Sequence, residues 1–134
     1  VALDGAGNLY VADSFNHTVR KVVVATSVVT TVAGVSGMVG STDGTGTAAL
    51  FNGPTGMAVD GAGNLYVADT GNLTIRKVVL ANGSVSALAG VVGQAGILPG
   101  PLPGRLNQPA GLAALPSGEL FIVDSGESVV LAIR

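Results

Sequence analysis

Short runs of apolar residues, separated by polar and Gly-rich turns, recur along the whole chain. The segment Asn64–Asp69 reads NLYVAD and is apolar at consecutive positions, so both faces of a strand formed by it would be apolar. A half-exposed strand alternates apolar and polar residues, whereas a strand covered on both faces reads as a continuous apolar run. The pattern therefore predicts short strands in sheets that are stacked between other sheets.

The region around this segment predicts four consecutive antiparallel strands. We expect them at Thr55–Asp60, Asn64–Asp69, Leu73–Leu80 and Ser84–Ala89, joined by the turns DGAGN, DTGN and ANGS. Glycine takes the positive φ angles that tight turns require, and Asn-Gly is a strong hairpin signal. Four antiparallel strands in sequence order form one blade of a β-propeller.

The nine residues GAGNLYVAD occur twice, at Gly5–Asp13 and at Gly61–Asp69. An alignment of Ala2–Val22 with Ala58–Val78 has 16 identities in 21 positions, and Ala113–Ile133 is a fainter third copy with 5 identities. A period of 55 to 56 residues indicates a modular array, in which each unit buries its faces against its neighbours. The sequence thus predicts an all-β fold, a β-propeller segment of about three blades made of four-stranded antiparallel sheets.

We expect residues 1–134 to form a single propeller segment with eleven strands. Blade 1 is predicted at 1–34, blade 2 at 54–90 and blade 3, which lacks its outer strand, at 109–134. Two Gly-rich segments join the blades, and we call residues 34–53 the first connection and residues 90–108 the second connection. Three blades do not close a ring, so we expect half of a six-bladed ring. The apolar edge formed by Ser128–Arg134 is expected to be covered in the working state.

The strand residues expected to be buried between sheets are Leu9, Val11, Leu65, Val67, Leu120 and Ile122.

Composition narrows the possible functions. The chain has no Cys, which excludes a disulfide framework and a thiolate metal site. Six Lys and Arg against eight Asp and Glu give a net charge of −2, whereas nucleic-acid binding depends on a basic surface. No apolar run reaches the roughly 18 residues of a membrane-spanning helix. We therefore predict no nucleic-acid partner and no membrane span.

Polar residues that could bind a ligand fall in the turns and connections of one face, which we call the loop face. Asp13, Asp69 and Asp124 recur at the end of the second strand of each unit. As a ring of carboxylates they could hold a cation or a polar ligand. Alternatively, each Asp accepts backbone N–H bonds across the turn that follows it, and its repetition in every unit favours this second interpretation.

Asp4 and Asp60, which begin another repeated turn, are predicted to stabilise that turn. The predicted ligand-binding residues of the loop face are Asp13, Asn16, His17, Asp43, Asp69, Asn72, Arg105 and Asp124.

Catalytic chemistry finds little support in the sequence. His17 is the only His, and without Cys it cannot build a metal site of the kind that needs several His ligands. The pairs Arg20–Lys21 and Arg76–Lys77 lie on predicted strands, where successive side chains point to opposite faces, so neither pair forms one basic spot. We predict no catalytic residues, no metal site and no cofactor.

The segment PTGMAVDGAGNLYVADTGNLTIRKV closely resembles the NHL repeat found in large bacterial proteins. The positions that match the family pattern are Pro54, Gly56, Asp60, Gly63, Asp69, Asn72, Ile75, Arg76 and Lys77. The segment FNHTVRK at Phe15–Lys21 also has the His of that pattern, whereas SGESVVLAIR in the third copy lacks the Asn and the Arg-Lys pair. The resemblance covers essentially the whole chain and implies a β-propeller, commonly of six blades.

These features predict a non-catalytic interaction or scaffold module of an extracellular or cell-surface bacterial protein. It would bind a protein or glycan through its loop face and complete its ring with further blades, supplied by a second copy or by the remainder of a longer propeller chain. Two alternatives stay open. One is a lactonase-like or lyase-like propeller enzyme with its site at the channel mouth, and the other is a structural self-assembly unit that builds a ring or filament.

Overall fold

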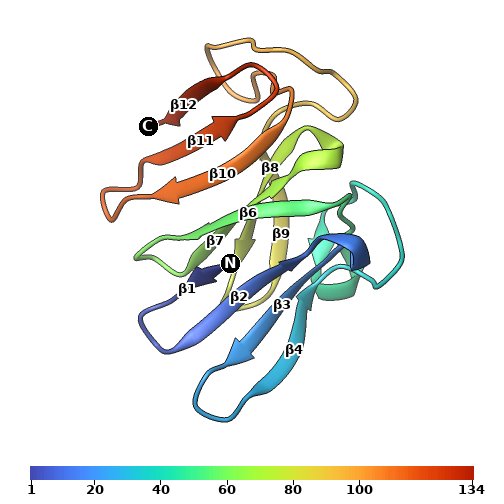
Figure 1. Cartoon of the computed structure of the whole chain (residues 1–134), viewed down its shortest axis with the longest axis vertical. Helices are drawn as coiled ribbons and strands as arrows, with labels where there is room; N and C mark the ends of the chain where they lie inside the picture. Colours follow the sequence, from blue (N-terminus) through green and yellow to red (C-terminus); the bar gives the residue numbers. More distant parts are fainter.

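The computed structural model describes residues 1–134 and consists of three antiparallel sheets stacked in sequence order (Figure 1). The first sheet has the order β1 (Ala2–Leu3), β2 (Asn8–Asp13), β3 (Thr18–Val23), β4 (Val28–Ala33). The second has β6 (Pro54–Val59), β7 (Asn64–Asp69), β8 (Thr74–Val79), β9 (Ser84–Ala89), and the third has β10 (Pro109–Ala114), β11 (Leu120–Asp124), β12 (Val129–Ile133). The predicted all-β fold of antiparallel propeller blades is confirmed.

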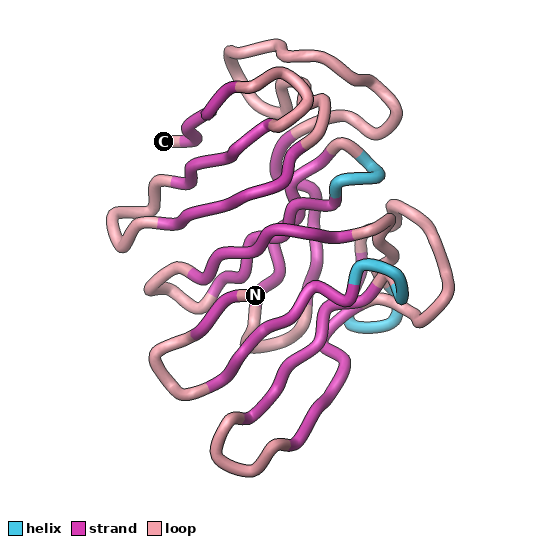
Figure 2. Tube along the Cα trace, in the orientation of Figure 1, coloured by secondary structure: helices cyan, strands magenta, loops and turns pink.

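The connections contain structure that the sequence did not predict. In the first connection, β5 (Gly44–Thr45) pairs with β9 and adds a fifth strand to the outer edge of the second sheet. Three single-turn 3₁₀ helices are also present (Figure 2): η1 (Ser14–Asn16), η2 (Gly46–Ala48) and η3 (Thr70–Asn72). The helices η1 and η3 replace the plain turns expected after β2 and β7. The first connection is thus part of the second sheet and is not a free loop.

The repeated Asp at the end of β6 closes the turn to β7, as predicted. Asp60 Oδ1 accepts hydrogen bonds from the backbone N–H groups of Ala62 and Asn64, at 2.9 and 2.8 Å. Its Oδ2 accepts from the Asn64 side chain and from the Tyr66 hydroxyl, at 2.8 and 3.0 Å. Burial acts against the charge of Asp60, but these hydrogen bonds outweigh it and lower the pKa of its carboxyl. Asp4 makes the same set of bonds in the first sheet.

Two apolar clusters lie between the sheets and hold them together. The cluster between the first and second sheets contains Tyr10, Val19, Ala33, Ala49, Phe51, Met57, Leu65, Val67, Val78 and Val85. The cluster between the second and third sheets contains Ala68, Ile75, Ala89, Leu106, Leu120 and Ile122. Successive residues in the strands of the second sheet therefore face the first and the third sheet in turn, which explains why NLYVAD is apolar on both faces.

Burial confirms four of the six predicted interior residues and contradicts two. Leu65, Val67, Leu120 and Ile122 are at most 2% exposed, but Leu9 and Val11 are only half-buried. The two exceptions lie on the face of the first sheet that points away from the second sheet, where nothing covers them. This outer face of the first sheet consists of Leu3, Leu9, Val11, Arg20, Val22 and Val29, which share one side by strand register.

The third sheet has a similar outer face, made of Phe121, Val123, Val130 and Ala132, with Val123 and Val130 being 45% and 66% exposed. Its strand β12 forms the edge of that sheet.

The second and third sheets lie very close together where β6 passes β10. A Cβ atom on Gly56 would lie 1.8 Å from the carbonyl oxygen of Ala110, a distance that no side chain can occupy. The Gly of the repeated Pro-x-Gly pattern is therefore required by the distance between neighbouring sheets.

Candidate functional site

Arg76 on β8 is buried and joins two of the predicted ligand-binding residues, although it was not itself among them. Its guanidinium is 1% exposed and forms ion pairs with Asp43 at 2.7 Å and with Asp69 at 3.2 Å. It also donates to the carbonyl oxygens of Leu50 and Thr42, both at 3.0 Å. Arg76 thus binds the first connection to the face of the second sheet, where it also lies 5.3 Å from the Phe51 ring centroid.

Asp69 and Asn72 complete this arrangement. Asp69 Oδ1 accepts the backbone N–H of Asn52 at 2.7 Å, and its Oδ2 accepts the Asn72 side-chain amide at 2.7 Å. The same amide of Asn72 donates to the carbonyl of Gly40 at 2.7 Å. Burial raises the pKa of Asp69, although the hydrogen bonds and the Arg76 charge oppose that rise. We call Asp69, Asn72 and Arg76 the clasp of the second sheet, because each of them holds the first connection.

The third sheet keeps the Asp of this clasp but loses its partners. Leu131 and Glu127 stand where the second sheet has Arg76 and Asn72. Both oxygens of Asp124 are consequently available to the backbone, and they accept the N–H groups of Asn107 and Gln108 at 2.7 and 2.9 Å. Asp124 therefore holds the end of the second connection together with Glu127, which accepts the Asn107 side-chain amide at 2.8 Å.

These contacts correct the interpretation of the repeated Asp residues. We expected each to accept backbone N–H bonds across its own following turn. Asp69 and Asp124 instead accept them from the connection that precedes their sheet, 16 to 17 residues earlier. The reason is that η3 satisfies its own turn, since the Leu73 N–H bonds to the carbonyl of Thr70. In the first sheet, Asp13 accepts only the Asn16 side chain, at 3.0 and 2.9 Å.

His17 connects the first sheet to the beginning of the second. Its Nδ1 accepts the backbone N–H of Gly53 at 3.0 Å, so it is more than a residue of a surface turn. Asp124 performs this function for Gln108 in the third sheet, whereas Asp69 has no oxygen free for Gly53 because its Oδ2 is taken by Asn72 and Arg76. His17 of the first sheet therefore accepts the Gly53 N–H that the Asp69 carboxylate has no oxygen free to accept.

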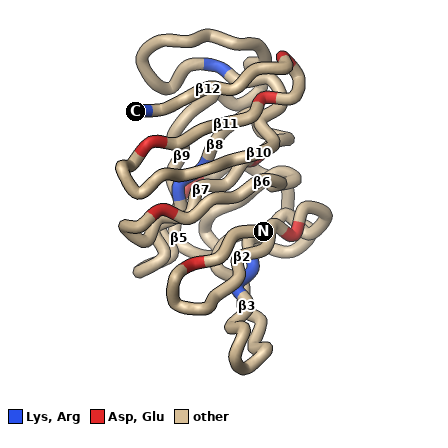
Figure 3. The backbone as a smooth tube through the Cα atoms, turned by 60° about the vertical axis from the view of Figure 1, so that its left-hand side comes forward, with Lys and Arg blue, Asp and Glu red and all other residues tan.

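The eight predicted site residues do not form one site. Asp43, Asp69 and Asn72 meet through Arg76 and the first connection, and Asp13 meets Asn16. Arg105 lies elsewhere, in the second connection, beside a cavity of about 100 Å³. No three His, Cys, Asp or Glu side chains lie close enough together to hold a metal ion. Charged residues are sparse along the whole chain (Figure 3).

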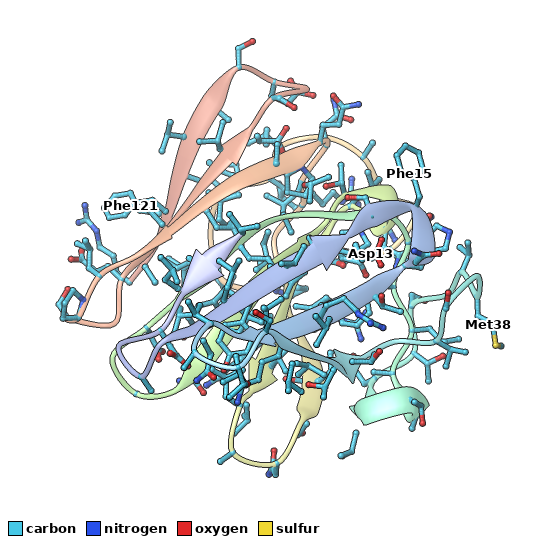
Figure 4. All side chains as sticks on the ribbon, turned by 60° about the horizontal axis from the view of Figure 1, so that its bottom comes forward. Asp13, Phe15, Met38 and Phe121 are labelled. Atoms are coloured by element: carbon cyan, nitrogen blue, oxygen red, sulfur yellow. The ribbon has the colours of Figure 1, made fainter.

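Exposed apolar side chains mark the loop face near η1. Phe15, at the middle of η1, is 96% exposed, and Met38 and Val39 in the first connection are 52% and 56% exposed. The N–H of Gly37 bonds to the carbonyl of Asn16, which places the connection beside this turn. Figure 4 shows Phe15 and Met38 projecting from the same end of the molecule, close to Asp13.

The repeated blades and their clasps define a segment of a β-propeller. The family model for the NHL repeat matches residues 51–78. The chain is 41% identical over 81 residues to NHL repeat-containing protein 2 of Homo sapiens, and 39% identical over 92 residues to Protein SUPPRESSOR OF QUENCHING 1, chloroplastic, of Arabidopsis thaliana. These alignments cover 60% and 68% of this chain but only 11% and 9% of those proteins. The chain belongs to the NHL-repeat family.

Solved structures share the fold over nearly the whole chain. A structural genomics protein of unknown function from Bacteroides thetaiotaomicron has a TM-score of 0.85 and 28% identity, with 93% of this chain and 32% of that one covered. An auxiliary nutrient binding protein from the same organism has a TM-score of 0.80 and 22% identity, with 96% of this chain and 35% of that chain covered. Virginiamycin B lyase from Staphylococcus aureus, in complex with Quinupristin, has a TM-score of 0.62 and 10% identity, with 99% of this chain and 39% of that chain covered. This chain thus spans about a third of these proteins.

None of the helices is long and apolar enough to cross a membrane.

Proposed function

We propose that this chain is a non-catalytic interaction module, which binds a protein or a glycan through the apolar part of its loop face. The observation that carries the proposal is the exposure of Phe15, which is 96%, at the same end of the molecule as Met38, which is 52% exposed. An aromatic ring held on a short turn loses little conformational entropy when it binds, which suits it to be an anchor. An extracellular or cell-surface location forms part of this proposal.

The turn that carries Phe15 is held in place by its neighbours. The Ser14 hydroxyl donates to the carbonyl of Pro54, His17 accepts from Gly53, and Asn16 accepts from Gly37. These bonds reach from η1 to the first connection and the second sheet, so the ring is presented from a fixed backbone. The polar residues around it are occupied by this support, which favours binding through apolar contact over acid–base chemistry.

Structural self-assembly is a second candidate, and the two outer faces favour it. Leu3 and Val29 on the first sheet and Val123 and Val130 on the third are 45% to 66% exposed. A second copy could place one such face on the other and close a ring of six blades. The nutrient-binding and lyase neighbours are at most 22% identical, share the fold alone, and therefore do not decide between binding and catalysis.

The test compares the parent chain with a Phe15→Ser variant on an array of neutral and acidic oligosaccharides and on a phage-displayed peptide library. We expect the parent to select one class of ligand and the Phe15→Ser variant to lose it. A Phe121→Ser variant is the matched control, because Phe121 lies on the outer face of the third sheet. Binding that survives Phe15→Ser, or a parent that selects nothing in either library, would refute the proposal.

A further inference from the structure

A cavity of about 100 Å³ lies between the second connection and the third sheet. Eight of the thirteen residues that line it are hydrophobic, among them Leu106, Ile122 and Leu131, and the others are Pro, Gly and Arg105. Arg105 therefore provides the only polar side chain of the lining. A cavity of this kind favours a ligand that is apolar over most of its surface and carries a single polar group.

The cavity takes the place that a stacked arginine and phenylalanine occupy in the second sheet. Arg76 lies over the Phe51 ring there, and both residues are at most 1% exposed. Their equivalents, 55 residues later, are Leu131 and Leu106. The residue after Phe51 and the residue after Leu106 both donate their N–H to the repeated Asp at 2.7 Å, so the two positions correspond in space as well as in sequence. The third sheet thus has two shorter side chains where the second sheet fills the space from within the chain.

The charges at this place are exchanged between the two sheets. In the second sheet the strand supplies the cation, Arg76, and the connection supplies the anion, Asp43, at 2.7 Å. In the third sheet the cation comes from the connection, as Arg105, and residues 90–108 contain no acidic residue. Arg105 forms no ion pair, since Arg76 and Arg134 are the only cations that do. An unpaired guanidinium at the rim of an apolar cavity favours a carboxylate, which it can bind through two hydrogen bonds.

Main-chain bonds hold the wall of the cavity that carries Arg105. Leu98 and Arg105 form an antiparallel bridge, and the N–H of Gly90 bonds to the carbonyl of Pro103 at 2.7 Å. Leu106, the next residue, is 3% exposed and belongs to the apolar cluster between the second and third sheets. The cavity is therefore formed before a ligand arrives, which lowers the entropic cost of binding.

We propose that this cavity binds a short aliphatic carboxylate. The hydrocarbon part lies against Leu106, Ile122 and Leu131, and the guanidinium of Arg105 holds the carboxylate at the rim. An apolar cavity of roughly 150 Å³ accommodates benzene, so this smaller cavity admits about four carbon atoms. The isobutyl group of 3-methylbutanoate has this size and a compact shape. The site is distinct from the loop-face surface around Phe15.

The test titrates 3-methylbutanoate into the parent chain labelled with ¹³C at the methyl groups of Leu and Ile. The methyl signals of Leu106, Ile122 and Leu131 should shift in a saturable manner. The uncharged amide of the same acid has the same shape, and we expect it to bind about tenfold more weakly, because it lacks the charge-assisted bond to Arg105. Equal affinities for the acid and the amide, or no saturable shift of these signals, would overturn the proposal.

Two variants separate the charge from the apolar cavity. Arg105→Gln should remove the preference for the acid over the amide without affecting the fold, because Arg105 is exposed. Arg20→Gln on the first sheet is the matched control and should keep the preference of the parent. Leu106→Phe gives this position the residue of the second sheet, so it should fill the cavity and abolish the binding of both ligands. Leu131→Phe, at a half-buried position, fills the same cavity and replaces that variant should it fail to fold. A preference that persists in Arg105→Gln, or parent-like binding by a filled variant, would refute the assignment.

Discussion

Arg76 and Arg20 occupy equivalent positions in two copies of the repeat, yet we expect them to contribute differently to the free energy of unfolding. Arg76 is buried in an ion pair with Asp69, and Arg20 lies on an uncovered face. We expect Arg76→Leu to reduce the free energy of unfolding by about 3–5 kcal/mol, because Asp69 would be left buried without its cation. Arg20→Leu should change it by less than about 0.5 kcal/mol. Urea denaturation of both variants and the parent checks this difference, and equal losses would contradict it.

The pair of Tyr10 and Asp4 makes stability depend on pH. Burial, followed by the hydrogen bond and the charge of Asp4, raises the pKa of Tyr10 to about 12, from an ordinary value of 10.0. A raised tyrosine pKa contributes stability that is complete below about 10 and is lost as the pH rises toward 12. The pKa of Asp4 is lowered, so the Asp4 contribution is present above its ordinary value of 3.8 and disappears in acid.

Replacing Tyr10 with Phe should therefore cost about 2 kcal/mol near neutral pH, since the lost bond has a charged acceptor. The difference between parent and variant should shrink between about pH 10 and pH 12, because only the parent loses the Tyr10 contribution there. Urea denaturation at neutral and alkaline pH measures it. The equivalent Tyr66 titrates in both proteins and serves as an internal control. A difference that stayed constant across this range would show that the hydroxyl contributes nothing through Asp4.

At the scale of the element, the spacing between strands of neighbouring sheets is set by Gly56. Gly56→Ala would place a Cβ 1.8 Å from the Ala110 carbonyl, so β6 and β10 would have to separate. We expect a loss of about 3 kcal/mol or more in the free energy of unfolding. Gly61→Ala is the matched control, because a Cβ there meets nothing within 4 Å. Thermal melts of both variants distinguish close packing from a general intolerance of the repeat to alanine.

Much of the element level could be predicted from the sequence, whereas the partners of the clasp could not. The apolar runs and Gly turns locate the strands, since these signals are local and are repeated. The spacing of Asp69, Asn72 and Arg76 is also visible, because it recurs in the first unit. The partners of Arg76, in contrast, lie in the middle of the first connection, up to 34 residues away, where the two connections share no sequence pattern. A repeating sequence pattern does not predict the path of such a segment. The sequence analysis therefore predicted neither the burial of Arg76 nor the strand β5.

At the scale of the whole molecule, the chain alone leaves two apolar faces and the edge of β12 uncovered. Val123 and Val130 on the third sheet are 45% and 66% exposed side by side, since they are register partners. We expect no stable monomer at micromolar concentration, because such faces associate in water. A double variant, Val123→Lys with Val130→Lys, should restore a monomer, because the two charges would repel and stay hydrated. Sedimentation velocity checks both, and a compact parent monomer of 13.0 kDa would refute the expectation.

The first connection is bonded at both ends to different sheets, through Asn16 and His17 to the first and through Asp69 and Arg76 to the second. Every contact of a connection is therefore made within about one period on either side of it. A duplication of one full period, wherever its breakpoints fall, reproduces all of these contacts in the added unit. A deletion inside the connection removes bonds from two sheets at once. Recombination can thus lengthen such an array in whole periods from any starting point, while a change of partial length breaks contacts in two sheets.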